Sequence, residues 1–71
     1  MSIEKTPLNK EQTLRLVNLL DIEEDVVEAN YVRVVDTVVC KIEVKYNGHE
    51  ESIYLKSDDM DLVLNGISLG R

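Results

Sequence analysis

The dipeptide Asn47-Gly48 is the feature that most constrains the fold of this 71-residue chain. Before it, residues 38–46 alternate between apolar and more polar side chains, which is the period of a strand with one buried face. Asn-Gly after such a segment predicts a two-residue hairpin loop, because both residues tolerate the positive φ of a type I′ turn. The resulting register places compatible side chains opposite each other: Lys45 with Glu50, Ile42 with Ile53, and Cys40 with Leu55. We therefore expect a hairpin over residues 37–56, with its return strand at about 49–56.

A helix is expected over about residues 8–20, where four apolar residues define one side: Leu16, Val17, Leu19 and Leu20. Two starts are possible. Thr6-Pro7 offers a cap followed by a proline that has no donor to lose. Asn9 with Gln12 offers a capping box.

Residues 21–30 are ambiguous, and the helical interpretation is modestly favoured. At 100° per residue four carboxylates fall within an arc of about 100°: Asp21, Glu24, Asp25 and Glu28. Asp21 would cap this helix and Asn30 would end it. A short strand over residues 31–35 is expected to follow, with Asp36-Thr37 as a turn or bulge.

The C-terminal third allows two structures. A helix over residues 57–66, capped by Ser57 and ended by Asn65-Gly66, is slightly preferred. The alternative is a second hairpin that turns at Asn65-Gly66. Residues 67–69 would form a short final strand in the helical case.

These elements predict a single α+β domain over residues 1–71, with an N-terminal helix followed by a small antiparallel sheet around a central β-hairpin. A core of this size supplies only roughly 3–5 kcal/mol. The apolar face formed by Val38, Cys40, Ile42 and Val44 has few covering elements within one chain. We therefore expect a homodimer.

No residue pattern predicts catalysis, a metal site or a cofactor. Residues 66–70 match G-x-S-x-G, but the chain holds no Asp or His after them. Cys40 and His49 lie several ladder positions apart in the expected hairpin, and zinc needs about four ligands. A lone cysteine, no secretory signal and no spanning apolar run are typical of a cytoplasmic protein.

The net charge of -6 is concentrated in two segments. Residues 21–30 carry -5 and residues 46–61 carry -4, whereas the rest of the chain is slightly positive. The candidate partner-binding residues are the carboxylates of these segments: Asp21, Glu23, Glu24, Asp25, Glu28, Glu50, Glu51, Asp58, Asp59 and Asp61. Such a charge argues against direct binding to nucleic acid and to anionic membranes.

Carboxylates three or four positions apart on a helix lie about 5–6 Å from one another, which is similar to the spacing of phosphates along a DNA strand. A row of them would fit a basic groove built for DNA, and the protein would inhibit a DNA-binding protein by mimicry. The simpler alternative is a solvated face that keeps a small protein in solution.

The length, acidity, helix-rich end and hairpin resemble the small acidic host-takeover proteins of lytic phages. In particular, the chain is similar to the DNA mimics that inhibit the bacterial nucleoid protein HU. The resemblance implies a homodimer in the bacterial cytoplasm, without enzymatic activity, that binds a basic HU-like protein. A second hypothesis is an adaptor or inhibitor of RNA polymerase or a defence enzyme, acting through an apolar sheet surface that involves Tyr31, Val35 or Leu62. An antitoxin is a third.

Overall fold

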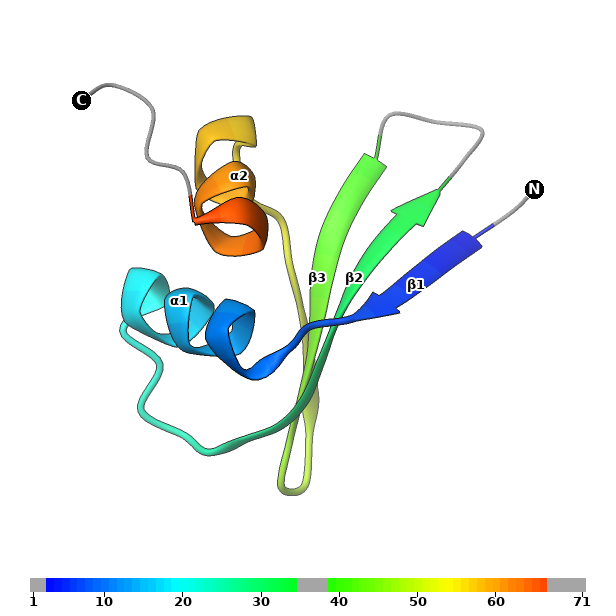
Figure 1. Cartoon of the computed structure of the whole chain (residues 1–71). Coiled ribbons are helices and arrows are strands. Elements are labelled where there is room, and N and C mark those ends of the chain that lie inside the picture. Colours follow the sequence, from blue (N-terminus) through cyan, green and yellow to red (C-terminus); the bar gives the residue numbers. More distant parts are fainter. Residues whose placement is uncertain (1–2, 35–38, 67–71) are drawn as a thin grey trace.

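The computed structural model describes residues 3–34 and 39–66, which form an α+β fold with two helices on one face of an antiparallel sheet (Figure 1). In chain order the elements are β1 (Ile3–Pro7), α1 (Lys10–Leu20), β2 (Val26–Val34), β3 (Val39–Tyr46), β4 (Glu50–Ile53) and α2 (Ser57–Asn65). The four strands pair in the order β1-β2-β3-β4. The expected fold class is therefore confirmed, except that a strand precedes the first helix.

The central hairpin has the predicted register. Lys45 lies opposite Glu50 and Ile42 opposite Ile53, and the backbone N–H of Tyr46 donates to the carbonyl of His49 at 2.8 Å. The ladder ends at the Ile42–Ile53 pair, so the expected pairing of Cys40 with Leu55 does not form. The type I′ assignment is wrong as well, because Gly48 has a φ of 106° whereas Asn47 is not at positive φ.

Helix α1 begins with a capping box, so the second of the two expected starts is correct. The Asn9 side chain accepts from the backbone N–H of Gln12 at 2.8 Å, and the Gln12 side chain accepts from that of Asn9 at 2.8 Å. The other start is wrong because Thr6 and Pro7 end strand β1, where Pro7 pairs with Asn30. Proline suits this position, since an edge strand does not need its N–H.

The helix expected over residues 21–30 is wrong. Strand β2 begins at Val26, five residues before the expected strand, and Asn30 lies opposite Glu43 within the ladder instead of ending a helix. Because β2 lies between β1 and β3, its backbone groups find partners on both sides. This pairing overrides the weak helical pattern of the segment. The turn expected at residues 36–37 and the apolar residues Val35 and Val38 lie outside the described residues.

Helix α2 confirms the helical alternative for the C-terminal third. It ends at Gly66, whose φ of 71° suits a residue without a side chain. The expected cap is wrong by one position: Ser57 is the first helical residue, and Lys56 precedes it without a side-chain capping bond. The strand expected at residues 67–69 lies outside the described residues.

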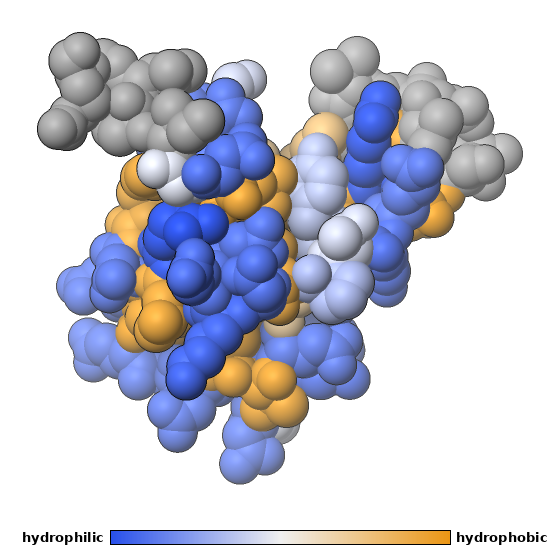
Figure 2. All heavy atoms as spheres, viewed as in Figure 1, coloured by the Kyte–Doolittle hydropathy of each residue, from blue (hydrophilic) through white to orange (hydrophobic). Residues whose placement is uncertain are grey.

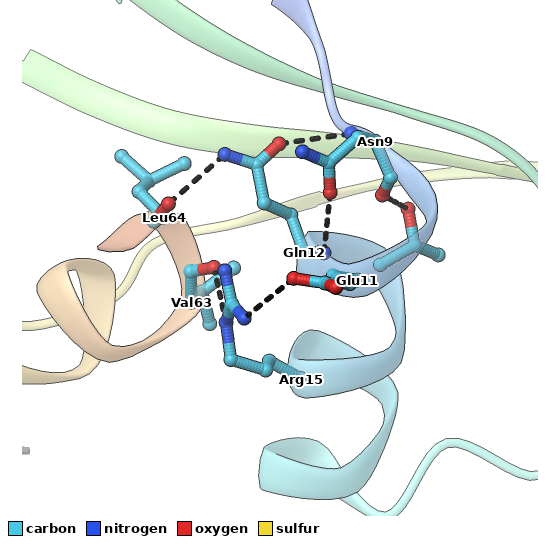
Figure 3. Close-up of polar contacts among 7 residues, drawn as sticks. Asn9, Glu11, Gln12, Arg15, Val63 and Leu64 are labelled. Carbon is cyan, nitrogen blue, oxygen red and sulfur yellow. Dashed lines mark hydrogen bonds and ion pairs between the residues drawn. The ribbon is translucent and has the colours of Figure 1, made fainter. Parts of the chain in front are cut away.

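Side chains of α1 cap the C-terminal end of α2 (Figure 3). The Nε of Arg15 donates to the carbonyl of Val63 at 3.0 Å, and the Nε2 of Gln12 donates to the carbonyl of Leu64 at 3.0 Å. The last carbonyls of a helix have no partner within it. Two polar residues of α1 therefore fix the position of α2 above the sheet.

The core lies between the sheet and the two helices. Ile42 and Val44 of β3 are 0% and 1% exposed, and they belong to one cluster with Leu16 of α1 and with Met60 and Val63 of α2. Polar residues cover most of the outer side of the helices, and apolar residues show mainly at the seams between elements (Figure 2). One chain thus covers Ile42 and Val44, which were expected to need a second copy; the homodimer itself stays a prediction.

The other face of the sheet carries a charged network. Glu43 of β3 lies 3.2 Å from the Nζ of Lys5 and 3.2 Å from that of Lys41. Both lysines are cross-strand neighbours of Val32, which is only 2% exposed although it lies outside the main core cluster. The two lysines thus flank Val32 on the neighbouring strands, while their charged ends contact Glu43.

Candidate functional site

The first group of candidate carboxylates lies in the loop between α1 and β2. Helix α1 ends at Leu20, and Asp21 follows in the left-handed conformation with a φ of 55°. The backbone N–H groups of Asp21 and Ile22 both donate to the carbonyl of Val17, which closes the helix in the manner of a Schellman motif. Asp21 thus ends one helix instead of capping the next, and the next three acidic residues lie in an exposed loop: Glu23, Glu24 and Asp25.

The tip of the β3–β4 hairpin contacts this loop through His49. The Nε2 of His49 lies 2.8 Å from Oε2 and 3.1 Å from Oε1 of Glu24. The His49 ring also stacks on the Tyr46 ring, with centroids 4.7 Å apart and planes at 27°. The loop and the hairpin tip lie toward the same end of the molecule (Figure 1).

Tyr46 links this contact to the second acidic segment. Its hydroxyl donates to Oε1 of Glu51 at 3.1 Å. Burial raises the pKa of Tyr46 most, and the hydrogen bond to Glu51 and the negative charges of Glu51 and Glu24 raise it further. Carboxylates from both acidic segments therefore act on the same phenol.

We use the name acidic end for six exposed carboxylates of the loop and of β4: Asp21, Glu23, Glu24, Asp25, Glu50 and Glu51. Two of them, Glu24 and Glu51, are connected through His49 and Tyr46. Glu50 lies opposite Lys45 and so on the other face of β4 from Glu51, which lies opposite Val44. His49 is the one basic side chain within residues 21–25 and 47–51. Lys45, opposite Glu50 in the ladder, is the nearest lysine along the hairpin. The acidic end is thus built from two segments and not from one helix face.

The remaining candidate carboxylates are elsewhere. Glu28 lies in β2, beside Lys45 in the ladder, and its Oε2 accepts from the side chain of Asn30 at 2.9 Å. The last three belong to α2: Asp58, Asp59 and Asp61. Asp58 and Asp59 lie in its first turn, where the helix dipole favours negative charge. Because the helix predicted for residues 21–30 is absent, the single helical row of carboxylates is not formed.

Sequence reasoning missed the part played by His49 and Tyr46. His49 directly follows the Asn47-Gly48 loop, and its side chain is 51% exposed. Its partner Glu24 is 25 positions away in the chain, so no local pattern predicts the contact. The one usable indication was the hairpin register, which places Tyr46 and His49 on either side of the Asn47-Gly48 loop.

Three further features bear on candidate chemistry: metal ligands, Cys40 and the G-x-S-x-G match. Within residues 3–34 and 39–66, no group of three or more His, Cys, Asp and Glu side chains could hold a metal ion. Cys40 is half-buried, and its Sγ accepts from the hydroxyl of Tyr31 at 3.2 Å. This hydrogen bond, together with burial, raises the pKa of Tyr31. The G-x-S-x-G match falls on residues 66–70, of which only Gly66 is described.

Among the described residues, neither helix is long and apolar enough to cross a membrane. Comparison with protein-family models, with curated proteins and with solved structures found no match.

Proposed function

We propose that this protein is a non-enzymatic inhibitor of a basic DNA-binding protein of the HU type, and that it acts by DNA mimicry through its acidic end. The observation that carries the proposal is the contact of Glu24 with His49, which brings the acidic loop to the acidic strand β4. Glu24 and Glu51, one carboxylate from each segment, are then connected through His49 and Tyr46, whereas the sequence separates them by more than twenty positions. Such a concentration of one charge attracts a basic groove and accelerates association.

Mimicry here does not depend on a helical row. A basic groove built for DNA binds several negative charges spread over its length, and it reads phosphates mainly through Lys and Arg. Four of the six carboxylates make no side-chain hydrogen bond or ion pair among the described residues, so they can meet those cations without first leaving an internal partner: Asp21, Glu23, Asp25 and Glu50. Binding should weaken steeply with salt, as expected for exposed charges.

A competitive gel shift tests the proposal. Purified HU-type protein bound to labelled DNA is challenged with this protein at low salt, and displacement at micromolar concentration is expected. The variant Glu23→Gln/Asp25→Asn/Glu50→Gln neutralises three carboxylates of the acidic end that make no side-chain hydrogen bond or ion pair among the described residues. It should lose displacement while keeping its circular dichroism spectrum.

The matched control is Asp58→Asn/Asp59→Asn/Asp61→Asn, which removes the same three charges from α2. It should still displace DNA. An equal loss of displacement in both variants would mean that the total charge of the protein matters and not the position of the carboxylates. If the unmodified protein does not displace DNA, the proposal is rejected. The homodimer implied by the resemblance is tested separately by sedimentation equilibrium.

A second candidate function is an adaptor or inhibitor that binds RNA polymerase or a defence enzyme through the sheet. It is favoured by two apolar side chains away from the helices, Ile3 at 59% and Tyr54 at 66% exposure. Lys41 lies 5.9 Å from the centre of the Tyr54 ring. Binding of this kind should persist at high salt and be lost in Tyr54→Ser. Binding by mimicry should be lost at high salt and persist in Tyr54→Ser.

A further inference from the structure

A hollow of about 350 Å³ lies between the sheet and the start of α2. The sheet contributes Tyr31 and Cys40 to its lining, and the chain after β4 contributes the rest: Leu55, Ser57, Met60 and Asp61. We call it the α2 hollow. Its walls combine apolar and polar groups, and its volume lies at the lower end of the range for ligand pockets, about 300–1,000 Å³. The α2 hollow therefore has the size and the mixed lining of a site for a small ligand.

The polar atoms of the α2 hollow are mainly hydrogen-bond acceptors. The Tyr31 hydroxyl donates its hydrogen to the Sγ of Cys40 at 3.2 Å, so the phenol oxygen keeps lone pairs that can accept. Asp61 makes no side-chain hydrogen bond or ion pair within residues 3–34 and 39–66, and the Ser57 hydroxyl can accept as well. No Lys, Arg or His side chain belongs to the described lining. A ligand that fits this lining must therefore supply donors.

The charge near the α2 hollow is negative. The first five residues of α2 and the residue before the helix carry three carboxylates and one ammonium group: Asp58, Asp59, Asp61 and Lys56. Asp58 and Asp59 already supply the negative charge that the N-terminus of a helix favours. On β2 the one cation is the exposed Arg33, and its cross-strand neighbour on β1 is Glu4, which offsets its charge. A cationic ligand is therefore attracted, whereas an anionic ligand is repelled.

We propose that the α2 hollow binds an aliphatic primary amine in its protonated form, with the ammonium group at Asp61 and the phenol oxygen of Tyr31 and the alkyl chain against Leu55 and Met60. An ammonium group has three donors and no acceptor, which matches a lining of acceptors. The flexible thioether of methionine adapts to alkyl chains of different shapes. This site lies apart from the acidic end, and it does not depend on mimicry of DNA.

Two probes of equal chain length test the site. The isotopically labelled full-length protein is titrated by NMR with n-butylammonium chloride and with 1-butanol, in about 150 mM salt so that distant charges are screened. Butylammonium should bind with a millimolar dissociation constant, at least about fivefold more tightly than butanol, because only the cation forms charge-assisted hydrogen bonds. The largest shifts should fall on the amides of Cys40, Met60 and Asp61.

A third probe identifies the source of the amine. The acetylated, amidated tripeptide Gly-Lys-Gly carries the same ammonium group on a peptide. Shifts of the same amides by this tripeptide would support the site and assign it to a lysine side chain of another protein. Shifts by butylammonium alone would support it as a site for a free amine.

Matched variants locate the binding. Asp61→Asn should weaken binding of butylammonium roughly three- to tenfold, whereas Asp58→Asn removes the same charge from the same helix outside the lining and should weaken it less than about twofold. Tyr31→Phe should also weaken binding, and Tyr54→Phe, outside the lining, should not. The dispersion of the amide spectrum shows that each variant is folded.

Equal affinity for butylammonium and butanol overturns the inference, and so do equal losses in Asp61→Asn and Asp58→Asn. The proposed function fails by a different result, since it requires displacement of HU from DNA in the gel shift.

Discussion

Glu24 and His49 lie 25 positions apart in the chain, yet the Nε2 of His49 and the Oε2 of Glu24 are 2.8 Å apart. This contact joins the loop after α1 to the turn between β3 and β4. It pairs the only histidine of the chain with one carboxylate of the acidic end.

Replacing His49 by Ala should loosen the acidic loop with little effect on global stability. The contact is half exposed, and exposed ion pairs contribute roughly 0.2–1 kcal/mol. Amide hydrogen exchange at residues 22–25 should accelerate while that of Ile42 and Val44 stays unchanged. Glu23→Gln, which leaves the His49 contact in place, is the control and should not change exchange. Unchanged exchange in His49→Ala would show that the loop is held by its backbone alone.

Replacing Asp21 by Gly should stabilise the protein. A left-handed φ of 55° strains a residue with a side chain, and glycine adopts it freely. The expected gain is about 0.5–1 kcal/mol, which in a chain of this size raises Tm by several degrees. Thermal unfolding followed by circular dichroism measures it. Asp25→Gly removes the same charge at a residue without positive φ and should lower Tm or leave it unchanged.

Removing the Arg15 side chain should destabilise the packing of α2. Arg15→Ala leaves the carbonyl of Val63 without its donor, and we expect a loss of about 1–2 kcal/mol in urea unfolding. Lys10→Ala, at the start of the same helix, should cost less than half as much. A methyl group at Gly66 would lie 3.2 Å from the Arg15 guanidinium and would force a positive φ on alanine, so Gly66→Ala should also destabilise.

The lowered pKa of Glu43 predicts that the folded protein loses stability in acid. Hydrogen bonds from Lys41 and Lys5 lower the pKa of the Glu43 carboxyl below its ordinary value of 4.5, although burial opposes this. Because the pKa is lower in the folded state, the stabilisation is complete above about pH 4.5 and is lost as the pH falls through the folded-state pKa. Urea unfolding between pH 7 and pH 3 should therefore show a smaller decline for Glu43→Gln than for the unmodified protein. Parallel curves for the two proteins would contradict the prediction.

The hairpin and the two helices follow from local sequence. Alternation up to Tyr46 and the Asn47-Gly48 loop determine the β3–β4 register, and the Asn9–Gln12 box determines the start of α1. Gly66 ends α2 because few other residues adopt its φ of 71° without strain. Each of these signals acts over a few residues, so its effect does not depend on contacts with the rest of the chain.

Strands β1 and β2 do not follow from local sequence. Thr6 and Pro7 suit a helix entry, and the acidic periodicity of residues 21–30 suits a helix, but both segments extend because neighbouring strands satisfy their backbone groups. Strand β1 pairs with residues more than twenty positions away, and β2 pairs with β3 at separations of up to twenty positions. Pairing with another segment of the chain leaves no mark on the local periodicity of either strand.

The candidate site likewise follows in part from the sequence and in part only from the fold. The sequence by itself determined which side chains carry the negative charge and that they come in two segments. Only the tertiary structure decided that Glu24 of the loop is connected to Glu51 of β4 through His49 and Tyr46, while the carboxylates of α2 belong to a different element. The physical reason is that composition fixes total charge, whereas the arrangement of that charge depends on long-range backbone pairing and on the packing of a buried phenol.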